Sequence, residues 1–401
     1  MYGIKKYGFV IGLVLMAMLS NAQTISGKLS FLANQEIALE GFNGLQTYAI
    51  ATTKIDANGN FKLAYTSTDL GMGYLKSTDN KPLLVVLSGE DIELLGEALS
   101  NPQTIKITKG QENQWFEQYA QQHPRREQAL SSWDYLEKIY ATDSLFTEKA
   151  KPYKAILQEK QRITKEDQLF LQSLPKESYV SWFLPLRKLV SSVATIAQYR
   201  TNEIPATIAA FRVLDYTDKR LYKSGLFKEA IESHFWLLEN CGKPLDSVFM
   251  EMQFSIDAML TNLKKDEQKL NEVTDYLFDV LEKRSLFKAS EYLALKVLNE
   301  VSCTINSDLA RQLETYRAMK VGNTAPEIVF PNTRVNPLND FTIHKLSDLT
   351  SNYTLVVFGA SWCPACTEEM TQLIPLYEKW NKLGLEAIFV SLDTDSTAFQ
   401  A

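Results

Sequence analysis

From residue 353 to residue 366 the chain reads YTLVVFGASWCPAC, and the fold of the C-terminal part can be predicted from these residues and their neighbours. Tyr353–Phe358 is a short, strongly β-prone run, which is typical of a buried parallel strand. A turn with two cysteines follows it, and Thr367–Leu383 then carries apolar residues on one helical face. Leu385–Leu392 is a second buried-strand run. The order strand, helix, strand predicts an α/β crossover unit.

The two cysteines, Cys363 and Cys366, stand where the predicted strand passes into the predicted helix. Unpaired backbone N–H groups and the helix dipole at that point favour a thiolate on Cys363, which makes it reactive and a good leaving group. Cys366, one helical turn further, can then attack a mixed disulfide formed on Cys363. Pro364 shapes the turn because it fixes its own φ, and Trp362 is expected to cover one side of the pair.

Two other interpretations of the cysteine pair stay open. A purely structural disulfide could use the same spacing. Half of a zinc site could also use it, but zinc needs two more ligands, and of the histidines only His344 is near in sequence. The strand-to-helix placement favours a redox-active pair over both. We therefore expect neither a metal nor a cofactor at this site.

Several short motifs surround the pair: Gly322-x-x-Ala325-Pro326, Leu346-Ser347-Asp348-Leu349, Val356-Val357-Phe358, and Trp362-Cys363-Pro364-Ala365-Cys366-x-Glu368-Glu369-Met370. With them, residues 321–401 resemble the thioredoxin superfamily, in its branch of extracytoplasmic TlpA/ResA-like thiol–disulfide oxidoreductases. The whole chain resembles proteins of Bacteroidetes-type bacteria that place a β-rich domain and a helical segment before such a domain. The resemblance implies that the first cysteine attacks and the second resolves.

The same resemblance makes Glu369, three positions after Cys366, a possible proton acceptor that tunes the pair. The alternative is an ordinary glutamate of the first helical turns, stabilised by the helix dipole. Two positions depart from the family: Gly359 stands where an aromatic residue is frequent, and Thr371 stands where a helix-kinking proline is common. The second departure predicts a straighter helix. A peroxiredoxin is disfavoured, because it needs a proline seven residues before its reactive cysteine, and the chain has none there.

The sequence stops at Ala401, soon after Leu385–Leu392, whereas a thioredoxin fold needs further strands and helices. We expect 321–401 to be an incomplete thioredoxin-like domain, its first half only, in a truncated chain. A domain-swapped form or one that has lost its function is the alternative. Such a half would leave apolar faces and a sheet edge unpaired.

Residues 23–108 alternate short apolar and polar runs with turn residues, which predicts an antiparallel β sandwich or barrel. Asn58-Gly59 predicts a hairpin, and Gly71-Met72-Gly73 is interpreted as another turn. Asp56, Asn58 and Asn60 alternate like a calcium-binding loop, but the remaining ligands are missing, so the plain hairpin is favoured. The predicted runs are Thr24–Leu32, Glu36–Glu40, Thr47–Ile55, Phe61–Tyr65, Tyr74–Lys76, Leu83–Leu87, Ile92–Leu95 and Thr104–Thr108.

Residues 109–320 are poor in glycine and predict an all-α region. Its apolar stripes favour a core, with a partner-binding groove as the alternative. His234, next to Phe235 and Trp236, is expected to be a packed or rim histidine. Cys241 and Cys303 are expected to be small buried residues that could pair in an oxidising compartment. The predicted helices are Lys228–Asn240, Ser247–Leu263, Asp266–Leu281 and Lys288–Glu300.

The first 22 residues have the layout of a secretory signal peptide. Lys5 and Lys6 precede the uncharged Gly8–Leu19, and small residues at Ser20 and Ala22 suit cleavage before Gln23. A retained membrane anchor is the alternative, although this apolar stretch is short for a span, which needs about 20 residues. We therefore expect a soluble, exported protein of the periplasm or cell envelope, which meets the membrane only through the signal peptide before cleavage.

Composition supports a globular, multidomain protein: 401 residues, of which 45% are apolar, with a net charge of −6. There is no basic excess, which argues against a nucleic-acid partner. The expected function is thiol–disulfide exchange with envelope proteins through Cys363 and Cys366, most plausibly reduction, with electrons from a membrane or periplasmic dithiol donor. The alternative is an envelope binding or scaffold module with an inactive thioredoxin-like appendage.

Overall fold

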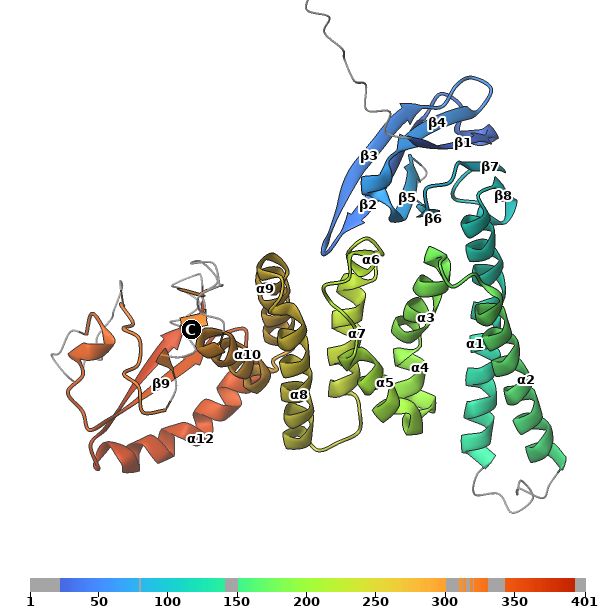
Figure 1. The fold of residues 1–401 in the computed structure, drawn as a ribbon. Helices are drawn as coiled ribbons and strands as arrows, with labels where there is room; N and C mark the ends of the chain where they lie inside the picture. Colours follow the sequence, from blue (N-terminus) through green and yellow to red (C-terminus); the bar gives the residue numbers. More distant parts are fainter. Residues whose placement is uncertain are drawn as a thin grey trace, which may run out of the picture. The chain divides into compact units, whose positions relative to one another are not determined.

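The computed structural model describes residues 22–78, 81–140, 151–300, 310, 311, 313, 314, 318, 319, 321–330 and 343–393. The chain divides into two compact units, Met1–Arg311 and Gln312–Ala401. The first holds a β region followed by helices, and the second a small α/β element (Figure 1). The predicted signal peptide, up to residue 21, lies outside the described residues, as does Cys303. Within the described ranges, no helix has the length and apolarity needed to cross a membrane.

The β region is a pair of four-stranded sheets, with strand orders β4-β1-β7-β8 and β3-β2-β5-β6. Each predicted strand run overlaps one of these strands. In the described residues no strand pairing joins the two sheets, so they do not form a closed barrel. The strands are β1 (Gln23–Leu29), β2 (Glu36–Asn43), β3 (Gln46–Lys54), β4 (Asn60–Tyr65), β5 (Gly71–Ser77), β6 (Leu83–Leu87), β7 (Ile92–Gly96) and β8 (Lys106–Lys109).

One sheet is mixed, which corrects the expectation of antiparallel pairing throughout. β1 runs antiparallel to β4 but parallel to β7, with Ile25 opposite Ile92 and Leu29 opposite Gly96. All four strands of the second sheet lie between β1 and β7 in the chain, and β7 then enters the first sheet in the direction of β1. The alternation of apolar and polar residues within a strand does not show whether β7 runs parallel to β1. The direction of β7 depends on how often the chain crosses between the sheets.

The turn at Asp56–Asn60 is not a β-hairpin, so that prediction was wrong. It connects β3 with β4, which lie in different sheets. The Asp56 carboxylate accepts hydrogen bonds from the Asn58 and Asn60 backbone N–H groups, both at 2.8 Å, and from Asn60 Nδ2 at 2.9 Å. The Asn60 side chain in particular lowers the pKa of Asp56. This carboxylate therefore holds the turn that carries the chain from one sheet to the other.

Gly71 and Gly73 lie within β5 rather than in a turn. At Gly71, where φ is +143°, a Cβ would lie 2.4 Å from the carbonyl oxygen of Lys223. The Met72 N–H donates to that carbonyl at 2.7 Å. Residue 71 is therefore glycine because β5 passes too close to the Lys223 backbone for a side chain to fit, and not because the chain turns there.

The core of the β region lies between its two sheets. β4 shows the underlying pattern, because Phe61, Leu63 and Tyr65 are buried and alternate with exposed residues. Burying one such side chain contributes about 1.5–3 kcal/mol. The fully buried members from other strands include Ile25, Leu29, Ile37, Leu39, Leu75, Leu87, Ile92 and Leu94.

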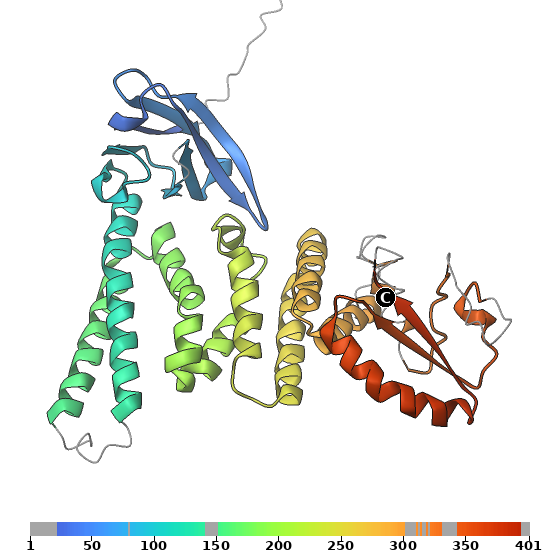
Figure 2. The same cartoon turned by 180° about the vertical axis from the view of Figure 1, so that it is seen from behind.

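The middle of the chain is helical, as expected, and Figure 2 shows these helices from behind. The four helices predicted from apolar spacing correspond to α7 to α10. The helices are α1 (Gln111–Tyr140), α2 (Lys151–Ser173), α3 (Tyr179–Ser191), α4 (Val193–Tyr199), α5 (Ile204–Arg212), α6 (Lys219–Tyr222), α7 (Phe227–Glu239), α8 (Leu245–Leu263), α9 (Glu267–Lys283) and α10 (Phe287–Glu300).

Helix α9 shows how sequence sets these elements. Asp266 caps its start by accepting a hydrogen bond from the Lys269 N–H at 3.2 Å. Its predicted apolar stripe is buried at Leu270, Val273 and Leu277, so the stripe faces the core. In α7, His234 is 1% exposed and its ring stacks on Phe211 with centroids 5.1 Å apart. The expectation of a packed histidine is confirmed.

The β region and the helices belong to one unit because backbone and side chains join them. The N–H of Gly44, at the tip of the β2–β3 hairpin, donates to the Tyr222 carbonyl at 2.9 Å. At the other side, the Asn113 side chain on α1 bonds both the N–H and the C=O of Val86 in β6, at 2.8 and 2.7 Å. That amide takes the place of a further strand at this edge of the sheet.

The second unit contains the predicted strand–helix–strand element: β9 (Tyr353–Gly359), α12 (Pro364–Asn381) and β10 (Leu385–Ser391). β9 and β10 pair in parallel from Tyr353–Leu385 to Gly359–Ser391. The two lead-in segments meet in an antiparallel bridge between Val329 and Lys345. α12 does contain a proline, Pro375, which has no N–H to donate to the carbonyl of Thr371 one turn earlier. The prediction of a straighter helix overlooked this residue.

Candidate functional site

The candidate site lies at the carboxyl end of β9, where the chain turns into α12. The Cys363 N–H donates to the Ala360 carbonyl at 3.1 Å, which closes the turn. Cys363 is the N-cap of α12, with φ −101° and ψ 99°, and Pro364 occupies the first helical turn. Proline suits that position, because its missing N–H would have no partner inside the helix. Parallel strands place this turn at one edge of the sheet, where α/β folds carry their sites.

Cys363 and Cys366 form a disulfide, with their Cα atoms 5.3 Å apart. The Cys366 N–H also lies 3.2 Å from Cys363 Sγ, so this sulfur takes the place of a capping oxygen. After reduction, the same N–H and the helix dipole would stabilise a thiolate on Cys363. The arrangement can therefore support exchange between a disulfide and a pair of thiols.

The other predicted site residues lie around the pair on the surface. Trp362 is 70% exposed and directly precedes Cys363, so its ring offers a flat apolar surface to the solvent. Pro364 is exposed on the first turn of α12, and Glu369 is exposed one turn after Cys366. The structure thus places Trp362, Pro364 and Glu369 on the elements that carry the cysteines.

Sequence reasoning missed Asp393, which follows β10. Its carboxylate accepts hydrogen bonds from the Ser361 backbone N–H, at 3.1 and 3.0 Å to its two oxygens, and from Ser361 Oγ at 2.8 Å. Ser391 Oγ donates to it at 2.7 Å. These bonds tie the cysteine-bearing turn to the end of the neighbouring strand. An aspartate directly after the second predicted strand was the available hint, because parallel strands bring their carboxyl ends together.

Gly359 is explained by its neighbour on β10. A Cβ at residue 359 would lie 2.6 Å from Cζ of Phe389 and 3.8 Å from Cβ of Cys366. The aromatic ring that the resemblance implies at residue 359 is therefore replaced by a ring on the adjacent strand. Phe389 is 37% exposed, so it covers the sheet beside the disulfide without being enclosed.

Two further residues that the sequence analysis singled out, Cys241 and His344, lie within the described residues. Cys241 is a free, half-buried thiol in the first unit. His344, the one histidine near the pair in sequence, is exposed, and its backbone N–H donates to Asp348 at 2.9 Å. Among the residues that the structure describes, no group of three or more His, Cys, Asp or Glu side chains could hold a metal ion.

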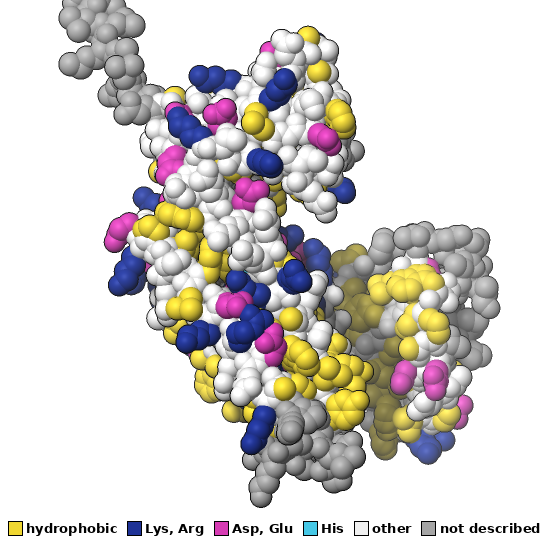
Figure 3. Space-filling model, turned by 90° about the vertical axis from the view of Figure 1, so that its right-hand side faces the viewer, with side chains coloured by type: hydrophobic (Ala, Val, Ile, Leu, Met, Phe, Trp, Pro, Cys, Tyr) yellow, Lys and Arg dark blue, Asp and Glu magenta, His cyan; other side chains and the backbone are white. Residues whose placement is uncertain are grey.

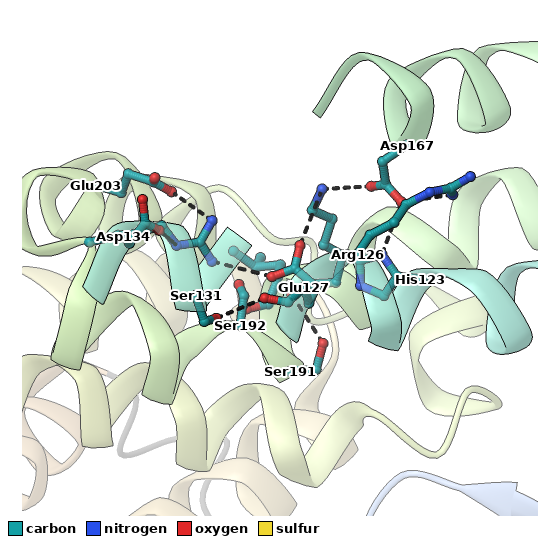
Figure 4. A network of polar contacts seen from close by, with 12 residues as sticks. His123, Arg126, Glu127, Ser131, Asp134, Asp167, Ser191, Ser192 and Glu203 are labelled. Carbon is teal, nitrogen blue, oxygen red and sulfur yellow. Dashed lines mark hydrogen bonds and ion pairs between the residues drawn. The ribbon is translucent and has the colours of Figure 1, made fainter. Parts of the chain in front are cut away.

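The helical region carries a second concentration of polar groups, drawn in Figure 4. Asp167 on α2 is 2% exposed and pairs with His123 Nδ1 at 2.9 Å and Lys188 Nζ at 2.7 Å. Burial would raise the pKa of Asp167, but the bonds from His123 and Lys188 outweigh it and lower the pKa to about 2. Nearby, Arg200 lies 3.4 Å from Glu127. These contacts bind α1 to α2, α3 and α4, which is a structural role.

Figure 3 shows the face of the first unit that includes α1 and α2. Basic and acidic side chains are interspersed on it, and among the described residues drawn there no large patch of one sign is formed. A hollow of about 530 Å³ between α1, α2 and α4 has the same mixed character, with Asp134, Glu137, Lys160 and Arg200 in its lining. In the described residues, neither the charged face nor the hollow contains a cysteine pair or another reactive group like that at the start of α12.

Comparison with known proteins finds a family model and similar curated proteins. Residues 321–401 match the model of the AhpC/TSA family. The thiol-disulfide oxidoreductase ResA of Oceanobacillus iheyensis is 30% identical over 110 residues, which are 27% of this chain and 54% of that protein. ResA of Geobacillus kaustophilus is 31% identical over 75 residues, 19% of this chain and 40% of that protein. No solved structure matches significantly.

The chain therefore spans about half the length of the curated relatives it matches. The matched residues include the strand–turn–helix segment in which Cys363 and Cys366 form their disulfide. The family of the C-terminal unit follows from this similarity together with the Cys363–Cys366 disulfide at the N-terminus of α12. This unit belongs to the thioredoxin superfamily, as a TlpA/ResA-like member.

Proposed function

We propose that the protein is a thiol–disulfide oxidoreductase that acts on exported proteins through its Cys-Pro-Ala-Cys pair. The observation that carries the proposal is the Cys363–Cys366 disulfide at the start of α12, where the Cys366 N–H points at Cys363 Sγ. A helix N-terminus lowers the pKa of such a thiol and makes it both a nucleophile and a leaving group. The similarity to two thiol-disulfide oxidoreductases supports the same chemistry.

The proposed reaction is reduction of a substrate disulfide. The Cys363 thiolate attacks one substrate sulfur, a mixed disulfide forms, and the other substrate sulfur leaves as a thiolate and takes a proton. Cys366 then loses its proton and attacks Cys363 Sγ, which releases the first substrate sulfur and closes the Cys363–Cys366 disulfide. The substrate gains two electrons and two protons. A dithiol partner in the membrane or periplasm restores the reduced pair by the reverse exchange, so no cofactor is required.

The neighbouring residues have supporting roles in this proposal. Glu369 accepts the proton of Cys366, since it follows one helical turn later on α12. Trp362 and Pro364 form the surface on which the substrate chain lies, and the 70% exposure of Trp362 leaves its ring available for such a contact.

We further propose that the protein acts in the periplasm or cell envelope after cleavage between Ala22 and Gln23. The proposal rests on the positive, apolar and small-residue regions of the first 22 residues. Amino-terminal sequencing of the protein from a cell-envelope fraction is expected to start at Gln23. A start at Met1 would instead support a retained anchor.

Reduction of insulin with dithiothreitol as electron donor tests the proposed activity. The full chain should accelerate the reaction, and Cys363→Ser should abolish that acceleration. Cys241→Ser is the matched control, because it removes a thiol of the first unit and should leave the rate unchanged. Equal rates with and without Cys363 would contradict the proposal and favour a binding or scaffold role.

A further inference from the structure

Asp393 is bonded to the turn that carries the redox pair. Its carboxylate accepts from both donors of Ser361, the backbone N–H at 3.0–3.1 Å and Oγ at 2.8 Å. On the other side it accepts from Ser391 Oγ at 2.7 Å, and that same hydroxyl accepts from the Asp393 N–H at 3.1 Å. The carboxylate therefore links the end of β10 to the residue two positions before Cys363.

The backbone on either side of this link is also paired. The Leu392 N–H donates to the Gly359 carbonyl at 2.8 Å, so the parallel ladder extends to the start of the turn. The Cys363 N–H donates back to Ala360 at 3.1 Å. Ser361 lies between these two bonds, and both of its donors point to Asp393. Without this acceptor, the middle of the turn would depend on water for its hydrogen bonds.

We propose that Asp393 is a positioning residue that holds the Ala360–Cys363 turn so that Cys363 Sγ meets the N-terminus of α12. This inference rests on the proposed function, because it concerns the reactivity of the same cysteine. The benefit to the thiolate comes from the Cys366 N–H at 3.2 Å, and hydrogen bonds weaken steeply as distance and angle deteriorate. Fixing Ser361 fixes the backbone that sets this distance.

The negative charge of Asp393 and its hydrogen bonds to the turn are expected to change the pKa of Cys363 in opposite directions. A carboxylate near a thiol disfavours the thiolate, so charge alone would raise the pKa of Cys363. The Ser391 hydroxyl, and then the Ser361 N–H and hydroxyl, lower the pKa of Asp393, so it is ionised at neutral pH and bound to these donors. Position and charge can therefore be separated by substitutions that remove one and keep the other.

The experiment measures the pH dependence of Cys363 alkylation in the reduced full chain, with Cys366 and the other cysteines replaced by serine. Asp393→Ala removes both the acceptor and the charge, and Asp393→Asn keeps an acceptor oxygen without the charge. Positioning predicts that Asp393→Ala raises the pKa of Cys363 by about half a unit, which lowers its alkylation rate at neutral pH about threefold. Asp393→Asn should leave the pKa unchanged or lower it.

Ser361→Ala provides a second variant with a milder change, because it removes the Oγ donor and keeps the backbone N–H. It should shift the pKa of Cys363 in the same direction as Asp393→Ala, by less, and it keeps the proposal testable if Asp393→Ala does not fold. Asp395→Ala is the control, since it removes an aspartate two residues further along. A lowered pKa in both Asp393 variants would show that charge alone acts and would overturn the positioning role.

The reactivity of Cys363 in the parent chain separates the proposed function from the positioning role of Asp393. If Cys363 of the parent chain has an ordinary thiol pKa and does not exchange with disulfides, the proposed function fails. If it is reactive while Asp393→Ala and Ser361→Ala leave its pKa unchanged, only the positioning role of Asp393 is overturned.

Discussion

The ring of Phe389 on β10 fills the space that a side chain at Gly359 on β9 would occupy, since a Cβ there would lie 2.6 Å from Phe389 Cζ. The two residues lie on paired strands, with Gly359 opposite Ser391 and Phe389 opposite Val357. The contact lies next to the disulfide, because the same Cβ would be 3.8 Å from Cβ of Cys366. Glycine at the end of β9 and phenylalanine on β10 therefore depend on each other.

The first prediction follows from this dependence. Gly359→Ala should destabilise the second unit by about 1–3 kcal/mol, the usual cost of overpacking, because the ring must move. Combining it with Phe389→Leu should recover part of the loss, while Phe389→Leu alone should cost less than Gly359→Ala. Hydrogen exchange of peptides from residues 353–393 measures the effect in this unit. Additive losses in the double variant would show that the two residues do not interact.

The second prediction concerns the buried His234. Burial, with a smaller contribution from Arg212, lowers the pKa of His234 to about 3. In the unfolded chain this histidine binds a proton below about pH 6.5, whereas in the folded protein it stays neutral. The free energy of unfolding should therefore be highest above pH 6.5 and should fall as the pH decreases toward 3. The slope is about 1.4 kcal/mol per pH unit. His234→Phe, which can keep the stack on Phe211, should remove this slope.

Urea unfolding of the first unit at several pH values between 7.5 and 4.5 measures this difference. His344→Phe is the control, because His344 is exposed and lies in the other unit. If the parent and His234→Phe lose stability in parallel over that range, His234 is not the group responsible.

The third prediction concerns the ion network in Figure 4. Asp167→Ala would leave His123 and Lys188 without their shared buried carboxylate, and breaking a buried ion pair in this way costs about 3–5 kcal/mol. Glu159→Ala is the control on the same helix, since the Glu159 side chain is partly exposed and pairs with Arg162 at the surface. Such surface pairs contribute about 0–1 kcal/mol. Equal losses in the two variants would contradict the structural role of Asp167.

The fourth prediction separates Glu369 from its neighbour. If Glu369 takes the proton of Cys366, Glu369→Gln should slow the resolution of the mixed disulfide about tenfold or more, in line with general base catalysis. Glu368→Gln removes the same charge from the neighbouring position on α12. It should have little effect, because Glu368 is not the proposed proton acceptor. Rapid-quench analysis of the mixed disulfide measures this step. Equal slowing by both variants would point to the helix charge rather than to a specific base.

Much of the fold could be predicted from the sequence because local pattern determined it. The alternation in Phe61, Leu63 and Tyr65 and the helical spacing in α9 report which side of an element is buried, and that does not depend on distant residues. The strand, cysteine turn and helix around Cys363 were predictable for the same reason. Gly71 of β5 was misinterpreted as part of a turn, because the reason for glycine there is the close approach of Lys223, 152 residues later in the chain.

The features that sequence did not reveal depend on tertiary neighbours. Parallel pairing of β1 with β7 depends on the path between the sheets, and the Asp56–Asn60 turn has hairpin residues although its strands belong to different sheets. In the site, Asp393 becomes important only because parallel pairing of β9 and β10 brings it to Ser361. No spacing rule connects two residues 32 positions apart.

The most direct test of the central claim is a redox titration of Cys363 and Cys366 in the folded full chain, equilibrated with buffers of graded thiol–disulfide ratio. The free thiols are alkylated and counted by mass at each ratio. We expect both thiols to appear and disappear together, as a two-electron couple that reaches the same midpoint from the reduced and the oxidised protein. A disulfide that stays closed in every buffer that leaves the protein folded, and opens only on unfolding, would contradict this expectation and mark the pair as structural.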